Sequence, residues 1–193
     1  MKQTILLLGI GTVLLTSGDA FPAMFTDVSG TAGLSGWFDV GYGASSGDID
    51  NDGDPDLFVS NFTTPNRLGD NMSGLFTDIA ASAGVENPDG AGYGASFGDI
   101  NNDGYLDLFV VNVNLAPGNE NLLYLNNQNQ TFTDITSTAG VDTYGRDVNF
   151  LDYNRDGRLD IYVTGRDSGD AANDRLYRNN GNNTFTDVAS SVG

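Results

Sequence analysis

The sequence contains no cysteine and no histidine. Without cysteine, the chain has no disulfides, no thiol chemistry and no lipid anchor on an N-terminal cysteine. Without histidine, it lacks the commonest general base and a frequent zinc ligand. The usual parts of nucleophilic catalysis are therefore missing, and we expect a protein that is not an enzyme.

Basic residues and glutamate are also scarce. The chain has 8 Lys and Arg against 26 Asp and Glu, for a formal charge of −18, and Glu86 and Glu120 are its only two glutamates. The short aspartate side chain keeps its carboxylate close to the backbone of a tight turn, so this imbalance indicates cation-binding loops. The negative field repels phosphate backbones and anionic lipid, so we expect no nucleic-acid partner and no binding to membrane surfaces.

Residues 1–20 have the pattern of a secretory signal peptide. Lys2 supplies a positive start, residues 5–15 are largely apolar, and Gly18-Asp19-Ala20 provides small residues for cleavage after Ala20. The apolar stretch is shorter than the roughly 20 residues that span a bilayer. We therefore expect a secreted, periplasmic or cell-surface protein with no membrane span once the leader is removed, and a repeat region over residues 21–193.

One short segment recurs four times along the chain. Phe-Thr-Asp-Val/Ile begins at Phe25, Phe76, Phe132 and Phe185, with offsets of 51, 56 and 53 residues, and each copy leads seven residues later to a small residue and Gly. A period of this size is typical of a propeller blade.

Between these marks, each repeat offers four short β-rich segments separated by turn residues, which is the pattern of a blade. The first segment is rich in Gly, Ala and Ser, as expected where inner strands crowd together. The sequence predicts an all-β fold of β-propeller-type blades, each of four antiparallel strands, in a partial or open propeller of three blades. The expected units are an orphan outer strand over 24–35 and blades over about 41–80, 92–137 and 145–189.

Three Asp-rich loops follow the first strands, and they share a nine-residue pattern. Positions 1, 3, 5 and 9 are Asp or Asn and position 6 is Gly, which permits the left-handed turn that returns position 9 to the same centre. Calcium takes about 6–8 oxygen ligands, so we expect about one Ca²⁺ in each loop. Val59, Val110 and Val163 stand at position 12, where an EF-hand requires Glu, so the loops are not EF-hands.

Position 7 varies in a way that suggests its role. It is occupied by Asp54, Tyr105 and Arg158, and because an arginine side chain cannot be a ligand, we expect this position to offer its backbone carbonyl. The predicted ligand set is Asp48, Asp50, Asp52, Asp54 and Asp56; Asp99, Asn101, Asp103, Tyr105 and Asp107; and Asp152, Asn154, Asp156, Arg158 and Asp160. The first loop carries four carboxylates at positions 1, 3, 5 and 9 and the others three, so we expect the first to bind Ca²⁺ most tightly.

This loop between two strands, together with Asn-x-Leu-x-x-Asn and Phe-Thr-Asp-Val/Ile-x-x-x-Ala-Gly, resembles FG-GAP/VCBS repeats. The likeness is greatest to bacterial ASPIC/UnbV-like and cartilage-acidic-protein-like β-propellers, which share integrin α-type calcium loops. The resemblance implies a calcium-stabilised propeller that serves as an extracellular interaction surface, with the loop residues above as ligands. The chain departs from the family pattern because it has only three calcium loops, whereas propellers of the family usually have about seven blades.

The predicted function is therefore that of a protein or glycan interaction scaffold in which Ca²⁺ is structural. The loops over 63–66, 115–120 and 167–173 are the expected contact surfaces. A fragment or accessory domain of a carbohydrate-active enzyme is the alternative. Because three blades do not easily surround an axis, an open stack, a homo-oligomer of half-rings and a fragment of a longer protein all stay open.

Overall fold

The computed structural model describes residues 25–37, 41–88, 91–113, 120–165 and 174–192. The predicted leader lies outside these residues, as do most of the loops over 115–120 and 167–173. In the described part, three four-stranded antiparallel sheets form the chain, as the repeat predicted.

Each sheet is built from strands in sequence order and is followed by one turn of helix. The first blade holds β1 (Gly41–Gly47), β2 (Asp56–Asn61), β3 (Arg67–Met72), β4 (Leu75–Asp78) and α1 (Ala80–Ala83). The second holds β5 (Gly92–Gly98), β6 (Asp107–Asn112), β7 (Leu122–Asn126), β8 (Phe132–Asp134) and α2 (Thr136–Ala139). The third holds β9 (Asp147–Leu151), β10 (Asp160–Thr164), β11 (Arg175–Asn179), β12 (Phe185–Asp187) and α3 (Ala189–Val192).

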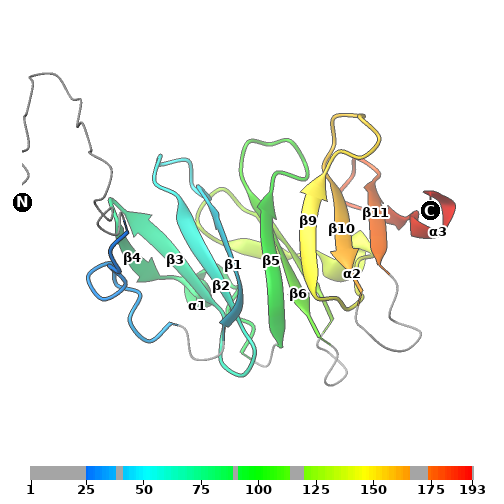
Figure 1. The fold of residues 1–193 in the computed structure, drawn as a ribbon. Helices are drawn as coiled ribbons and strands as arrows, with labels where there is room; N and C mark the ends of the chain where they lie inside the picture. Colours follow the sequence, from blue (N-terminus) through cyan, green and yellow to red (C-terminus); the bar gives the residue numbers. More distant parts are fainter. Residues whose placement is uncertain (1–24, 38–40, 89–90, 114–119, 166–173, 193) are drawn as a thin grey trace, which may run out of the picture.

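The blades lie side by side in an open row, with β1, β5 and β9 adjacent along one side (Figure 1). Glycine is required where these inner strands meet. A Cβ on Gly43 would lie 2.3 Å from the Tyr93 carbonyl oxygen, and one on Gly98 would lie 2.6 Å from the Phe150 ring. The small-residue composition of the first strand therefore reflects crowding between neighbouring blades.

Two apolar cores fill the junctions between blades. The first joins Ile49, Phe58 and Leu68 of blade one to Leu108, Val110, Tyr124 and Phe132 of blade two. The second repeats the arrangement with Ile100, Phe109 and Leu123 against Ile161, Val163, Tyr177 and Phe185. The second strand is apolar on both faces because each face contacts a different neighbour.

The recurring Asp and Gly that flank the short helices have local structural roles. The Asp78 carboxylate accepts a hydrogen bond of 3.1 Å from the Ala80 N–H at the start of α1, and Gly84 ends that helix with φ of 80°. Gly140 ends α2 in the same left-handed conformation. Each repeat thus contains one helical turn, which is too short to produce a helical periodicity in the sequence.

Residues 25–37 form turns, whereas an outer strand was expected over 24–35. Among the described residues, no third strand of a preceding blade lies beside this segment to pair with it. Phe25 is 93% exposed, while Phe132 and Phe185 are buried. Ala32 and Trp37 instead cover one side of blade one. The Phe76 N–H donates to the Ala32 carbonyl at 2.9 Å, and the Trp37 ring occupies the space beside Gly69.

Candidate metal centre

Each Asp-rich loop connects the inner strand of a blade to its second strand, and the three loops lie along one edge of the row (Figure 1). Gly53, Gly104 and Gly157 at position 6 have φ of 97°, 88° and 83°. Position 4 is also left-handed, and here Asn51, Asn102 and Arg155 have φ near 60° in each case: 62°, 58° and 62°. These two residues reverse the chain, which brings position 9 back toward position 1.

The side chains of each loop fold inward onto its own backbone. The Asp48 carboxylate accepts hydrogen bonds from the N–H groups of Asp52 (3.1 Å) and Gly53 (3.0 Å), and Asp52 accepts one from Asp54 (2.8 Å). The same bonds recur from positions 1 and 5 of the other loops. The loop shape is therefore fixed by the same hydrogen bonds in all three blades.

The acid at position 9 ties the loop to the third strand. Asp56, Asp107 and Asp160 are at most 1% exposed. In the second blade, the Asp107 carboxylate accepts one N–H from Ile100 (3.0 Å) and one from Asn126 (2.8 Å). Asp56 and Asp160 accept hydrogen bonds from the N–H groups at the matching positions of their own blades, namely loop position 2 and the third-strand Asn.

Burial makes two of these acids, Asp56 and Asp107, reluctant to ionise in the absence of a cation. Desolvation raises the pKa of Asp56 to about 6, with the N–H groups of Ile49 and Asn71 opposing the rise and the charges of Asp50 and Asp70 adding to it. Desolvation likewise raises the pKa of Asp107 to about 7, with contributions from Asp103 and Asp99. A bound cation would offset both effects.

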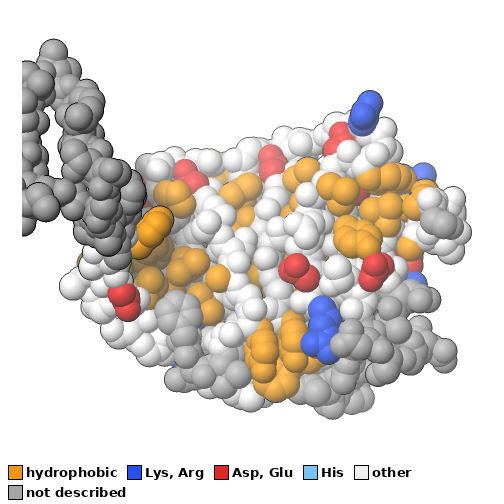
Figure 2. Space-filling view, in the orientation of Figure 1, with side chains coloured by type: hydrophobic (Ala, Val, Ile, Leu, Met, Phe, Trp, Pro, Cys, Tyr) orange, Lys and Arg blue, Asp and Glu red, His pale blue; other side chains and the backbone are white. Residues whose placement is uncertain are grey.

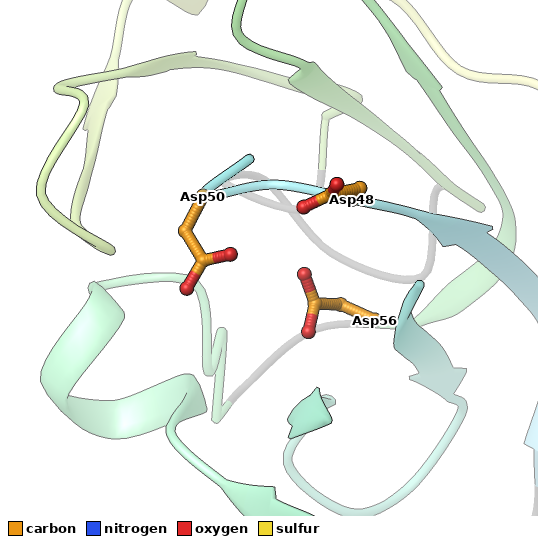
Figure 3. A group of neighbouring side chains, drawn as sticks. All are labelled: Asp48, Asp50 and Asp56. Carbon is orange, nitrogen blue, oxygen red and sulfur yellow. The ribbon is translucent and has the colours of Figure 1, made fainter. Parts of the chain in front are cut away.

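In the first loop, three carboxylates converge on one point. Asp48, Asp50 and Asp56 point toward one another (Figure 3), and one oxygen of each lies within 4.8 Å of the other two. Oxygens that share one Ca²⁺ at 2.3–2.6 Å can be at most about 5 Å apart, so the spacing and the donor type fit calcium. Across the described ranges, this is the one group of three acidic, His or Cys side chains with such spacing.

The second and third loops place an amide where the first places Asp50. Asn101 accepts the Asp103 N–H through its oxygen and donates to the Asp103 carboxylate at 2.9 Å. Asn154 bonds Asp156 in the same way. These loops have the same shape, with one carboxylate fewer among positions 1, 3, 5 and 9.

Two predicted residues of the first loop lie outside the carboxylate group. Asp52 is exposed and its carboxylate bonds the Asp54 N–H. The Asp54 carboxylate accepts the Ser73 N–H at 2.8 Å, in the turn between β3 and β4. Because the Asp54 side chain is bonded to Ser73, position 7 can reach the loop centre only through its backbone carbonyl. The full ligand set stays a prediction.

Sequence reasoning missed two residues beside the first loop. The Gln130 side-chain amide, from the turn after β7, donates to Asp50 at 2.7 Å and to Asp70 at 3.1 Å. Burial raises the pKa of Asp70, and the charges of Asp50 and Asp52 raise it further. Gln130 is 80 residues from Asp50 in the chain, so no local sequence pattern could have indicated it. Asp70 could have been noticed, because the matching positions of the other two blades hold Leu125 and Arg178 and only blade one has an acid there.

Neighbouring loops are joined in series by asparagine side chains. The Asn51 amide donates to the Gly104 carbonyl at 3.0 Å, and the Asn102 amide donates to the Gly157 carbonyl at 3.3 Å. Third-strand asparagines bridge in the other direction, from Asn126 to the Ile49 carbonyl and from Asn179 to the Ile100 carbonyl, each at 2.8 Å. The first and second loops are thereby each held by the following blade.

Residues 43–47 and 94–98 match the letters Gly-x-Ser-x-Gly. A nucleophile elbow needs a sharp turn from strand to helix and a partner base, but both segments lie inside inner strands, and the sequence has no His. The Ser45 hydroxyl accepts the Phe97 N–H across the junction, at 3.2 Å. These serines thus have a place in strand packing.

The fold and the loops define a repeat protein, and sequence comparison identifies the repeat. The family described as FG-GAP-like repeat matches residues 48–110, 111–163 and 152–193, and the chain belongs to this family.

The curated relatives include cartilage acidic protein 1 from three vertebrates. The chain is 32% identical to the mouse protein (Mus musculus) and 33% identical to the human protein (Homo sapiens), in each case over 154 residues and 79% of the chain. It is 36% identical to the Xenopus tropicalis protein over 118 residues, or 60% of the chain. The matched parts make up 24%, 23% and 17% of these relatives, so the chain spans less than a quarter of their length.

A membrane-spanning helix needs a long apolar run. Among the described residues, no helix is both long and apolar enough to cross a membrane.

Proposed function

We propose that this protein is a calcium-binding, extracellular interaction module in which each Asp-rich loop holds one structural Ca²⁺. The convergence of the Asp48, Asp50 and Asp56 carboxylates on a point of calcium size carries the proposal. The second and third loops share the backbone of the first, so we extend the proposal to them with Asn101 and Asn154 as amide ligands.

The ion would supply the positive charge that the loops lack. Carboxylates held within a few ångströms of one another repel in the folded chain, and burial adds a cost to the ionised forms of Asp56 and Asp107. The loop residues hold the inner strand against the second strand, and position 9 holds both to the third. Binding of calcium would therefore be coupled to folding of the blade.

An aromatic cluster at the opposite end of the inner strands supports the scaffold role. Tyr42 and Tyr93 stack with ring centres 4.6 Å apart, Phe62 packs edge-on against both, and the Arg146 guanidinium lies 5.2 Å from the Tyr93 ring centre. Tyr42 is 54% exposed. Tyr and Arg are enriched among the residues that carry most of the binding energy at protein interfaces, and Phe62 lies directly before residues 63–66, one of the expected contact surfaces.

An extracellular location fits the proposed chemistry. Calcium modules outside cells typically bind with dissociation constants on the order of 10⁻⁴–10⁻³ M, which cytosolic calcium would not fill. The leader pattern of residues 1–20 points to the same location.

Calorimetric titration of the chelator-stripped protein with Ca²⁺ tests the metal proposal. We expect about three sites per chain, with loss of the tightest in Asp48→Ala. Ser82→Ala, on the exposed face of α1, is the matched control and should keep all sites. Absence of calcium binding, or an unchanged tightest site in Asp48→Ala, would refute the proposal.

Glycan and protein arrays probed with calcium-loaded protein test the scaffold role. A partner that binds the native chain and loses binding in Tyr42→Ala would support it. Equal binding by the native and Tyr42→Ala proteins would show that the aromatic cluster is not the contact surface.

A further inference from the structure

The two junctions between blades follow one rule, and among the described residues the third blade presents the same surface without a neighbour. Each junction buries an apolar residue from loop position 2, the second strand, the third strand and the short helix of the leading blade. At these places the third blade has Tyr153, Tyr162, Leu176 and Ala189, all of them only half-buried, and Val192, which is 55% exposed. A cavity of about 460 Å³ opens here, lined in part by Tyr162, Leu176 and Val192.

Figure 2 shows hydrophobic side chains gathered at the surface over this blade, with charged groups beside them. The hydrogen bonds that join one blade to the next also have no counterpart at the third blade among the described residues. In the first two junctions, a third-strand Asn donates to the carbonyl at loop position 2. In the third loop that carbonyl belongs to Tyr153, and the described part of the chain contains no following blade to supply the donor.

The first blade presents the opposite half of a junction. In blade two, Gly92 is buried and Ala95 half-buried against the blade before it, whereas the matching Gly41 and Ala44 are exposed. A second cavity of about 230 Å³ lies against this inner strand, lined by residues that include Gly41, Tyr42 and Ala44. Within the described residues, the row of blades therefore has two end faces that complement each other.

Charge indicates which surface fits the third blade. Residues 145–189 carry six Arg against eight Asp, whereas residues 41–80 carry one Arg against seven Asp, so the third blade is the less acidic of the two. Arg155 takes the position from which Asn51 and Asn102 reach the Gly carbonyl of the next loop. By the same arrangement, the Arg155 side chain would reach the Gly53 carbonyl in the first loop of another copy. Gly53 is next to Asp54, and only the first loop has an acid at that position.

We propose that two copies of this chain pair head to tail, with the third blade of each on the first blade of the other, to close a ring of six blades. Arg155 of one copy meets Gly53 and Asp54 of the second, and the face formed by Tyr162 and Leu176 is buried. A pair closed at both ends satisfies both faces of each chain, as a cyclic assembly requires.

Residues 25–37 and α3 are equivalent pieces of the repeat, and a junction has room for one of them. Trp37 and Ala32 are buried on blade one, whereas α3 buries no residue. In the pair, α3 gives way and residues 25–37 of the second copy take its place. This displacement opposes association, so we expect a dimer that dissociates on dilution.

Sedimentation equilibrium of the calcium-loaded protein over a range of concentrations tests the proposal. The expected mass is twice that of the chain. Arg155→Glu and, separately, Asp54→Arg should each raise the dissociation constant at least about tenfold, because each places like charges across the junction. Arginine at position 7 suits the loop, since Arg158 stands there in blade three.

The double variant that combines Arg155→Glu with Asp54→Arg restores the opposite charges and should regain the dimer. Leu176→Asp should weaken the pair, while Thr138→Asp on the exposed side of α2 in the middle blade should not. A monomer at every concentration, larger assemblies that grow with concentration, or a double variant as weak as the single ones would each overturn the proposal.

Discussion

The first Asp-rich loop and the two that follow have the same backbone and different charge. All three fold position 1 onto the N–H groups of positions 5 and 6, and all bury position 9 against the third strand. Only the first has a carboxylate at position 3, with Asp70 and Gln130 beside it. Loop shape is therefore set by residues that all three loops share. Under the proposed function, cation affinity depends on position 3, so loop shape and affinity should be separable by mutation.

The buried acid common to all loops should give the largest effect. Asp56→Ala and Asp107→Ala each leave two buried N–H groups without an acceptor, at about 1–3 kcal/mol apiece. We expect both to lower the free energy of unfolding by roughly 2–4 kcal/mol in chelator, measured by urea denaturation. Asp103→Ala, which is exposed, should cost much less; a loss confined to one of the two blades would contradict the shared role.

Exchanging position 3 should move affinity from one loop to another. A unit charge 4 Å from another is worth about 1 kcal/mol in water, so a divalent ion should lose about 2 kcal/mol, or roughly thirtyfold in affinity, in Asp50→Asn. Asn101→Asp should tighten the second loop by a similar factor, as measured by calorimetry. Asn102→Asp adds the same charge at position 4, whose side chain bonds Gly157, and should change affinity far less; an equal gain there would remove the distinction.

The raised pKa values of Asp56 and Asp107 predict how stability depends on pH without metal. A folded-state pKa of about 6 or 7, above the unfolded value near 3.8, means that the folded state holds more protons in between. Stability in chelator should therefore fall as pH rises from about 4 to about 7, and saturating calcium should weaken or reverse this fall. Melting curves across that range would check it, and a rise with pH in chelator would be the opposite result.

The smallest effect is expected at Asp70. Leu125 occupies the matching position of blade two, so Asp70→Leu should be tolerated and should remove repulsion with Asp50 and Asp52. We expect a gain of up to about 1 kcal/mol in chelator, in line with partly exposed charge pairs, and a slightly weaker first calcium site. Destabilisation in chelator would show that its bond to Gln130 matters more than the repulsion.

The sequence predicted the repeat, the four-strand blade and the three loops because their determinants are local. Left-handed Gly53 and the acids around it are within nine residues of one another, and the crowding of inner strands is visible in the glycines themselves. The contacts between blades could not be predicted in this way. Gln130 and Asn126 act on residues about 80 positions away, and only the stacking of one blade on the next brings them together.

The first Phe-Thr-Asp segment shows the limit of arguing from a repeat. Residues 25–28 have the letters of β8 and β12, yet they form no strand, because a strand also needs a neighbour to pair with. Trp37, which no repeat motif includes, fills the space beside Gly69 that a tyrosine takes in the other blades.

Thermal unfolding with and without calcium tests the central claim most directly. At a calcium concentration one hundred times the dissociation constant, one site should add about 2.7 kcal/mol, and each kcal/mol should raise the midpoint by about 2–4 °C in a domain of this size. We predict a midpoint at least about 5 °C higher in calcium than in chelator. Coincident melting curves in the two buffers would contradict the claim that these loops hold structural calcium.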